Sequence, residues 1–177
     1  MGAVFIVGGA PPGVVLIAYV AAVSLPLVNA DVLFHRLPNR FTVPGLALAA
    51  WTVLAGSLRA LEQPLSDGGE PIVWILLGSL VYGASCALAW WFGGLGSGDV
   101  KLAFLLGAAA GSVGFGVVVL AVGLGVFGAF LGGLSRVTRV ARTRGGAIEG
   151  GSSIPIGPAL IVGFWLALVA TRWCGTW

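Results

Sequence analysis

Long apolar runs separated by short polar stretches dominate the chain. Six such runs are visible, at about 13–30, 41–58, 72–92, 99–111, 115–134 and 156–171. A helix that crosses a bilayer needs about 20 mostly apolar residues. The pattern therefore predicts an all-α, polytopic integral membrane protein with about six transmembrane helices, folded as a single membrane-embedded domain over residues 1–177.

The composition supports lipid as the solvent for most of the chain. Hydrophobic residues make up 58% of the sequence and charged residues only 8%, whereas a soluble domain carries about 25% charged residues. Mean hydropathy is +1.05. The net charge is +3, but the bases lie in short loops, where they indicate topology rather than nucleic-acid binding.

The basic residues predict an orientation. With six spans, only Arg59 and Arg172 fall on one side, and the remaining seven bases fall on the other. The positive-inside rule then places both termini outside the cell and the basic loops in the cytoplasm, in a plasma (inner) membrane. The seven are Arg36, Arg40, Lys101, Arg136, Arg139, Arg142 and Arg144.

Glycine-rich stretches leave one boundary open. Gly111 to Gly114 is consistent with a tight turn between two helices or with one longer, kinked helix. The four-residue spacing of Gly107 and Gly111, and of Gly128 and Gly132, predicts close helix packing in lipid.

Metal and cofactor chemistry find little support. The chain has one histidine, His35, and its two cysteines form no CxxC pair. No cofactor and no metal are expected.

Two acids at the edges of apolar runs, Asp31 and Asp99, are the candidate chemical groups. An ionisable residue at membrane depth is costly, which makes it a functional candidate. Each has a structural alternative, since Asp31 could mark where a helix meets water and Asp99 could be an N-cap. Two carboxylates a few ångströms apart cannot both ionise cheaply, so one keeps a proton. One acid then polarises a peptide carbonyl while the other activates water, which is aspartyl proteolysis.

Three segments resemble motifs of type IV prepilin peptidases, which are GxGD membrane aspartyl peptidases. Residues 31–39, DVLFHRLPN, resemble the motif of their first aspartate, and residues 96–102, GSGDVKL, resemble their GxGD motif. Residues 154–159, IPIGPA, resemble their late Pro-Phe-Gly-Pro segment, with Ile156 in place of Phe. The three motifs occur in the family's order and cover most of a six-span chain.

The resemblance implies an endopeptidase that removes basic leaders from type IV prepilins or pseudopilins on the cytoplasmic side. It makes Asp31 and Asp99 the catalytic pair. The bifunctional members also methylate the new N-terminus and carry a domain with paired CxxC motifs. No such cysteines occur here, so the chain resembles the short form, without methyltransferase activity. The expected partners are the prepilin substrate and membrane lipid; the oligomeric state stays open.

Neighbouring residues are predicted to shape the site. Gly96 and Gly98 let a substrate strand approach the carboxylate closely. Lys101 points to a different helix face from Asp99. It either lowers the pKa of Asp99 from nearby, or packs against the protein or reaches the lipid headgroups instead. The other site-shaping residues are the turn residues Pro38 and Asn39 and the late-motif residues Pro155, Gly157 and Pro158.

Three alternatives compete with this interpretation. Presenilin-like peptidases share GxGD, and residues 158–160 spell PAL, but Ala30 stands where those proteins have Tyr and the chain is short for their nine spans. A proton-coupled small transporter or channel would use Asp31 and Asp99 as a relay. A structural membrane subunit would leave the motif combination unexplained.

Overall fold

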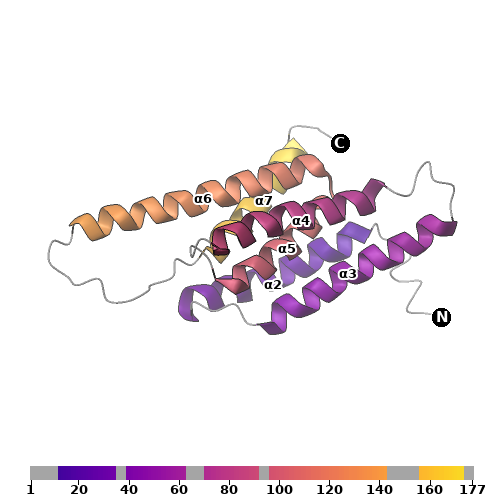
Figure 1. Cartoon of the computed structure of the whole chain (residues 1–177), viewed down its shortest axis with the longest axis horizontal. Helices are drawn as coiled ribbons and strands as arrows, with labels where there is room; N and C mark the ends of the chain where they lie inside the picture. Colours follow the sequence, from indigo (N-terminus) through magenta and orange to yellow (C-terminus); the bar gives the residue numbers. More distant parts are fainter. Residues whose placement is uncertain (1–11, 35–38, 63–69, 92–95, 143–155, 174–177) are drawn as a thin grey trace.

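The computed structural model describes residues 12–34, 39–62, 70–91, 96–142 and 156–173. All the regular structure among them is helical, in agreement with the predicted all-α class, and the helices pack into an elongated bundle (Figure 1). The helices are α2 (Pro12–Phe34), α3 (Asn39–Glu62), α4 (Glu70–Trp91), α5 (Ser97–Gly111), α6 (Phe115–Arg142) and α7 (Gly157–Trp173).

Three of the described helices are long and apolar enough to cross a membrane. Their apolar windows cover Gly13–Asp31, Asn39–Leu58 and Ile72–Trp91. Two shorter apolar stretches, Phe115–Gly128 and Gly157–Trp173, lie in α6 and α7. The chain therefore has the character of a membrane protein, and the count of six spans stays a prediction.

Helix α6 differs most from its predicted bounds. The fifth apolar run ends near residue 134, whereas the helix continues to Arg142. Arg136, Arg139 and Arg142, which the sequence places in a loop, therefore belong to a continuous helical backbone. Hydropathy marks where apolar side chains stop, but arginine is a good helix former and does not end a helix.

Helix α5 lies at the centre of the bundle and contacts α4 over most of its length. Its face towards α4 includes Gly107 and Gly111, where a Cβ atom would collide with the backbone of α4, at Gly78 and Trp74 respectively. The predicted close packing at Gly107 and Gly111 is thus confirmed. Small residues at this spacing let two helices approach closely in lipid, where dispersion contacts replace the hydrophobic effect.

A tight turn separates α5 from α6, which resolves the boundary that the sequence leaves open. Helix α5 ends at Gly111, and α6 begins at Phe115. Gly114 has a φ of +155°, a conformation that residues with a side chain rarely adopt. The one-kinked-helix alternative is therefore wrong, and glycine at 114 has a local conformational reason.

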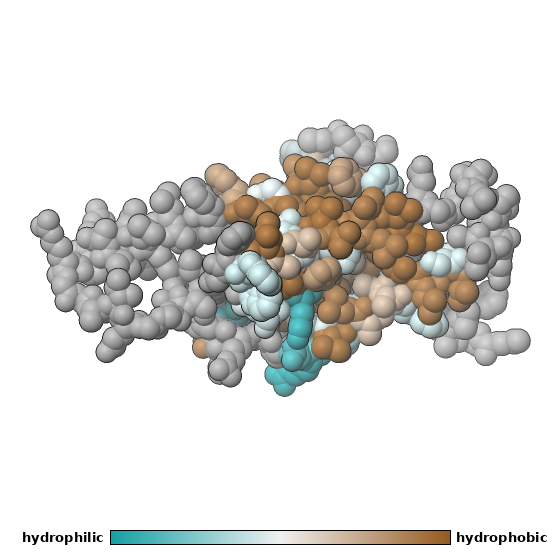
Figure 2. All heavy atoms as spheres, in the orientation of Figure 1, coloured by the Kyte–Doolittle hydropathy of each residue, from teal (hydrophilic) through white to brown (hydrophobic). Residues whose placement is uncertain are grey.

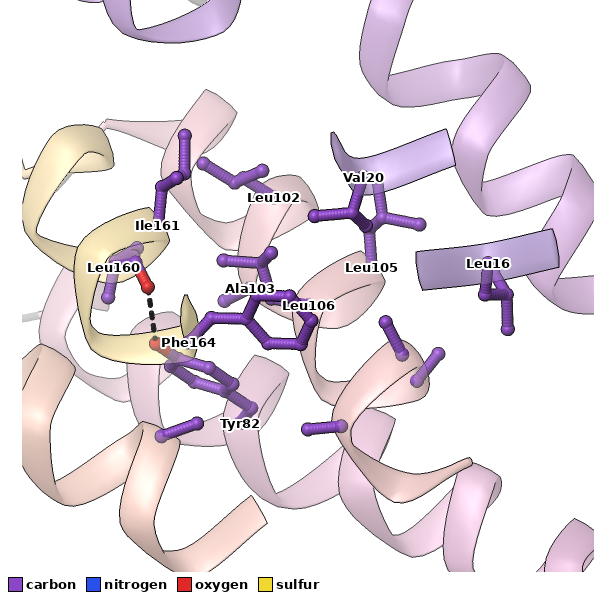
Figure 3. Close-up of a cluster of buried hydrophobic side chains, with 14 of the residues drawn as sticks. Leu16, Val20, Tyr82, Leu102, Ala103, Leu105, Leu106, Leu160, Ile161 and Phe164 are labelled. Carbon is purple, nitrogen blue, oxygen red and sulfur yellow. Dashed lines mark hydrogen bonds between the residues drawn. The ribbon is translucent and has the colours of Figure 1, made fainter. Parts of the chain in front are cut away.

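The interior of the bundle is a tightly packed apolar cluster around α5 (Figure 3). Tyr82 and Phe164 are its largest fully buried side chains. On the face shown in Figure 2, the coloured surface is mostly apolar, and the hydrophilic residues gather in small areas. Large side chains such as Leu25, Leu33 and Trp91, exposed by 70% or more, have the surroundings expected of a lipid-facing surface.

Candidate active site

The two candidate acids are both buried at the same end of the bundle. Asp31 lies in the last turn of α2, and Asp99 is the third residue of α5. Each side chain is only 5% exposed. An isolated carboxylate would not be buried in this way without a compensating environment or a proton, so the pair has the burial expected of functional acids.

Gly157 shows that the two carboxylates converge. A Cβ atom placed on Gly157 would lie 2.8 Å from Asp31 Oδ2 and 3.5 Å from Asp99 Oδ1. Both acids therefore reach the same small volume beside the first residue of α7. Asp31 is also close enough to act on the Asp99 carboxylate by like-charge repulsion. The predicted approach of residues 31 and 99 is thus present in the fold, with Gly157 of the late motif as the third component.

The backbone at the start of α5 holds Asp99. Gly96 is the N-cap residue, and its N–H donates to Asp99 Oδ2 at 3.3 Å. Asp99 is therefore not the N-cap, and that alternative is wrong. As the third residue of the helix, Asp99 instead accepts the N–H of the N-cap residue, as the acidic residue of a capping box does. Asp99 Oδ1, the oxygen nearest Gly157, has no hydrogen-bond partner among the described residues.

Gly96 has a conventional backbone geometry. Its φ of −83° and ψ of 151° lie in the extended region, and a Cβ there would meet Asp99 Oδ2 at 3.5 Å, an ordinary contact. The fold itself therefore does not require glycine at 96. The exposed position leaves close approach by a substrate as the reason that the sequence suggests. Gly98 is half-buried in the first turn of α5.

Lys101 joins the two motif segments. Its Nζ donates to Asn39 Oδ1 at 3.0 Å, across 62 positions of sequence. This contact is more specific than the packing or headgroup role that the sequence suggests, and nothing in the linear pattern indicates it. Pro158 is half-buried in the first turn of α7. Pro38, Pro155 and His35 lie outside the described residues.

Two further hydrogen bonds, not anticipated from the sequence, hold α2 in place. Tyr19 Oη donates to the carbonyl of Phe41 at 2.6 Å, near the start of α3. Trp165 Nε1 in α7 donates to Ser24 Oγ at 3.3 Å. The helix that carries Asp31 is thus hydrogen-bonded to two of its neighbours, α3 and α7.

The described residues contain no group of three or more His, Cys, Asp or Glu side chains that could hold a metal ion. What the described site offers is a pair of buried acids beside a glycine backbone. Such a pair can share one proton and perform general acid and base catalysis on a peptide bond.

Comparisons with known proteins leave the chain without an assigned family. No family model matches it, and no curated protein or solved structure matches it either.

Proposed function

We propose that the chain is a membrane aspartyl endopeptidase that cleaves basic leader peptides from type IV prepilins or pilin-like precursors on the cytoplasmic side. The observation that carries the proposal is the convergence of two buried carboxylates, Asp31 and Asp99, on the backbone of Gly157. All three residues lie in the motif segments that resemble the prepilin peptidases.

The chemistry follows from the pair sharing one proton. The ionised acid removes a proton from a water molecule, whose oxygen attacks the carbonyl carbon of the scissile peptide. The protonated acid donates its proton to the carbonyl oxygen, which stabilises the tetrahedral intermediate. Collapse of the intermediate breaks the C–N bond: the acid that took the proton of the water passes it to the leaving amine, and the other acid takes its proton back from a hydroxyl of the intermediate. Each acid therefore has one role, and neither replaces the other.

Glycine at the site favours a peptide substrate. Gly157 presents backbone rather than side chain to the carboxylates, and a larger residue would enter the space that they share. A substrate backbone needs the same kind of close approach to lie between the acids. The exposed glycine at position 96 adds a second place, next to Asp99, where an extended strand fits without a side chain in its way.

The location of the pair favours a peptidase over a proton relay. A relay would place acids near the bilayer midplane, along a path between the two sides. Asp99 is instead in the first turn of α5, and Asp31 is in the last turn of α2. Both acids are thus at one end of the bundle, where a cytoplasmic leader peptide can reach them.

Co-expression with a candidate prepilin tests the proposal. Wild-type chain should shorten the prepilin by the length of its leader, seen as a gel shift and checked by N-terminal sequencing of the product. Asp31→Asn should leave the precursor intact. Glu62→Gln, which removes an acid at the far end of α3, is the matched control and should cut normally. A panel of prepilins that all stay full-length beside well-expressed wild type would contradict the proposal.

A further inference from the structure

The start of α5 is held from two sides. On one side the Asp99 carboxylate accepts the N–H of Gly96 at 3.3 Å. On the other, Lys101 Nζ donates to Asn39 Oδ1 at 3.0 Å. Residues two apart on a helix emerge about 200° apart around its axis. The carboxylate therefore points inwards to α2 and α7, while the ammonium group points to α3.

The bond to Asn39 reaches the segment that follows Asp31. Asn39 is the first residue of α3, eight positions after Asp31 (39 − 31). The start of α3 is in turn bonded to α2, the helix that carries Asp31, because Tyr19 Oη donates to the Phe41 carbonyl at 2.6 Å. A shift of Asn39 away from α5 moves the start of α3, which packs against both α2 and α5. Lys101 is thus linked to the first motif as well as to the second.

The need for such a link follows from the chemistry. Two acids that share a proton and a substrate must be held within a fraction of an ångström, and a misplacement of about 1 Å can cost about 100-fold in rate. Asp31 and Asp99 come from different helices, α2 and α5, and no disulfide or metal among the described residues joins them. A hydrogen bond between the two motif segments supplies a cross-connection that apolar packing alone does not.

The geometry points to Lys101 as a positioning residue for the proposed peptidase reaction. It acts through Asn39, and the bond sets the distance between Asp31 and Asp99. This inference rests on the proposed function. Lys101 does not contact the reacting atoms in this role, so the chemical step depends on it while substrate affinity does not. Lys101 has this effect through its hydrogen bond to Asn39 and not through its charge.

A double-mutant cycle on cleavage kinetics tests the role. Lys101→Met and Asn39→Leu should each lower kcat by about 10- to 100-fold with KM within about twofold, and the double variant should match either single one. Asn39→Asp keeps the acceptor oxygen of this bond, so its kcat should stay close to that of wild type. Arg40→Gln removes a neighbouring exposed cation, which lies over the Phe41 ring, and should have no effect.

Several kinetic outcomes would overturn the inference. A loss in Lys101→Met without one in Asn39→Leu would mean that the ammonium acts by its charge rather than through Asn39. Multiplying effects in the double variant would mean two independent roles. Normal kcat in both single variants would leave the bond without a function. The proposed peptidase activity would survive all three outcomes, because wild type would still cut.

A distance measurement tests the same inference without any cleavage assay. Spin labels at Leu33→Cys in α2 and Ser97→Cys in α5 occupy exposed positions near the two acids. Cys174→Ser provides the background, and the remaining thiol, Cys86, is buried. The label-to-label distance distribution should be narrow in the labelled parent chain.

Further substitutions in the labelled chain distinguish the loss of the Lys101–Asn39 bond from a general loss of stability. Adding Lys101→Met should broaden or shift the distribution, and Asn39→Asp should leave it unchanged. Arg40→Gln serves as the control here too. An unaltered distribution in Lys101→Met would overturn the inference whether or not a substrate is known. Failure of every prepilin to be cut, with the distribution changing as expected, would count against the proposed function alone.

Discussion

Replacing Gly157 by Ala adds one methyl group at the point where the two carboxylates meet. The new Cβ would lie 2.8 Å from Asp31 Oδ2 and 3.5 Å from Asp99 Oδ1. Ordinary contacts of this kind begin near 3.4 Å, so the Asp31 oxygen must retreat by roughly half an ångström. Asp99 can stay where it is. The substitution therefore displaces one acid of the pair and leaves the other.

The expected cost to folding is small. Moving the end of a carboxylate side chain off its preferred rotamer costs about 0.5–1.5 kcal/mol. Replacing glycine by alanine in a helix gains back about 0.4–1 kcal/mol through the unfolded chain. The two terms nearly cancel, and the free energy of unfolding should change by less than about 1 kcal/mol. Catalysis has no such compensation, because the displaced acid no longer faces its partner and the substrate correctly.

The rate should fall by about 10- to 100-fold, equivalent to about 1.4–2.7 kcal/mol of transition-state stabilisation. The assay is kcat/KM for prepilin cleavage at matched expression, with the thermal midpoint measured on the same samples. Gly123→Ala, where a Cβ meets nothing within 4 Å, is the matched control: kcat/KM should be unchanged, and the thermal midpoint should be equal to that of wild type or slightly higher. Full activity in Gly157→Ala would refute the shared-volume geometry, and so would a loss that is fully explained by unfolding.

Three further predictions concern the fold. Gly107→Val places a branched side chain against the backbone of α4 and should destabilise the protein by about 1–3 kcal/mol or more; Gly123→Val, in open space, should cost far less in the same thermal assay. Tyr82→Phe removes a long 3.4 Å bond to the Leu160 carbonyl and should cost about 1 kcal/mol or less, whereas Tyr82→Ala empties a fully buried position and should cost about 3–5 kcal/mol. Reporter fusions after residues 144 and 177 should report cytoplasmic and external locations respectively, and a cytoplasmic signal from the second would reject the six-span count.

The apolar runs predict the helices well but not their arrangement. Most of them are apolar on every side, so periodicity does not show which face turns inwards. The central position of α5 has a weak signal in its composition, because residues 107–111 are all Gly or Ala and small side chains suit a helix surrounded by others. The extension of α6 to Arg142 lies beyond the fifth apolar run, so a search for apolar runs does not find it.

The candidate site also has some features that the sequence predicts and others that it does not. Asp31, Asp99 and Gly157 are recognisable because each falls in a motif, and their convergence follows from a chemistry that needs two acids together. The bond between Lys101 and Asn39 is not predictable, since it joins positions 62 apart and neither residue type is diagnostic of it. The sequence does not predict the bonds from Tyr19 and Trp165 either. A polar group in an apolar helix indicates that it has a hydrogen-bond partner, but not which residue that partner is.

Cleavage by Asp31→Asn, by Asp99→Asn and by the double variant, at matched membrane expression, tests the central claim most directly. Asn keeps the size of the side chain and an oxygen that can accept the Gly96 N–H, so the fold should survive. Each single change should abolish prepilin processing, and the double change should cost little more, because the two acids act as a unit. Near-normal processing by either single variant would remove that residue from the pair and contradict the aspartyl mechanism.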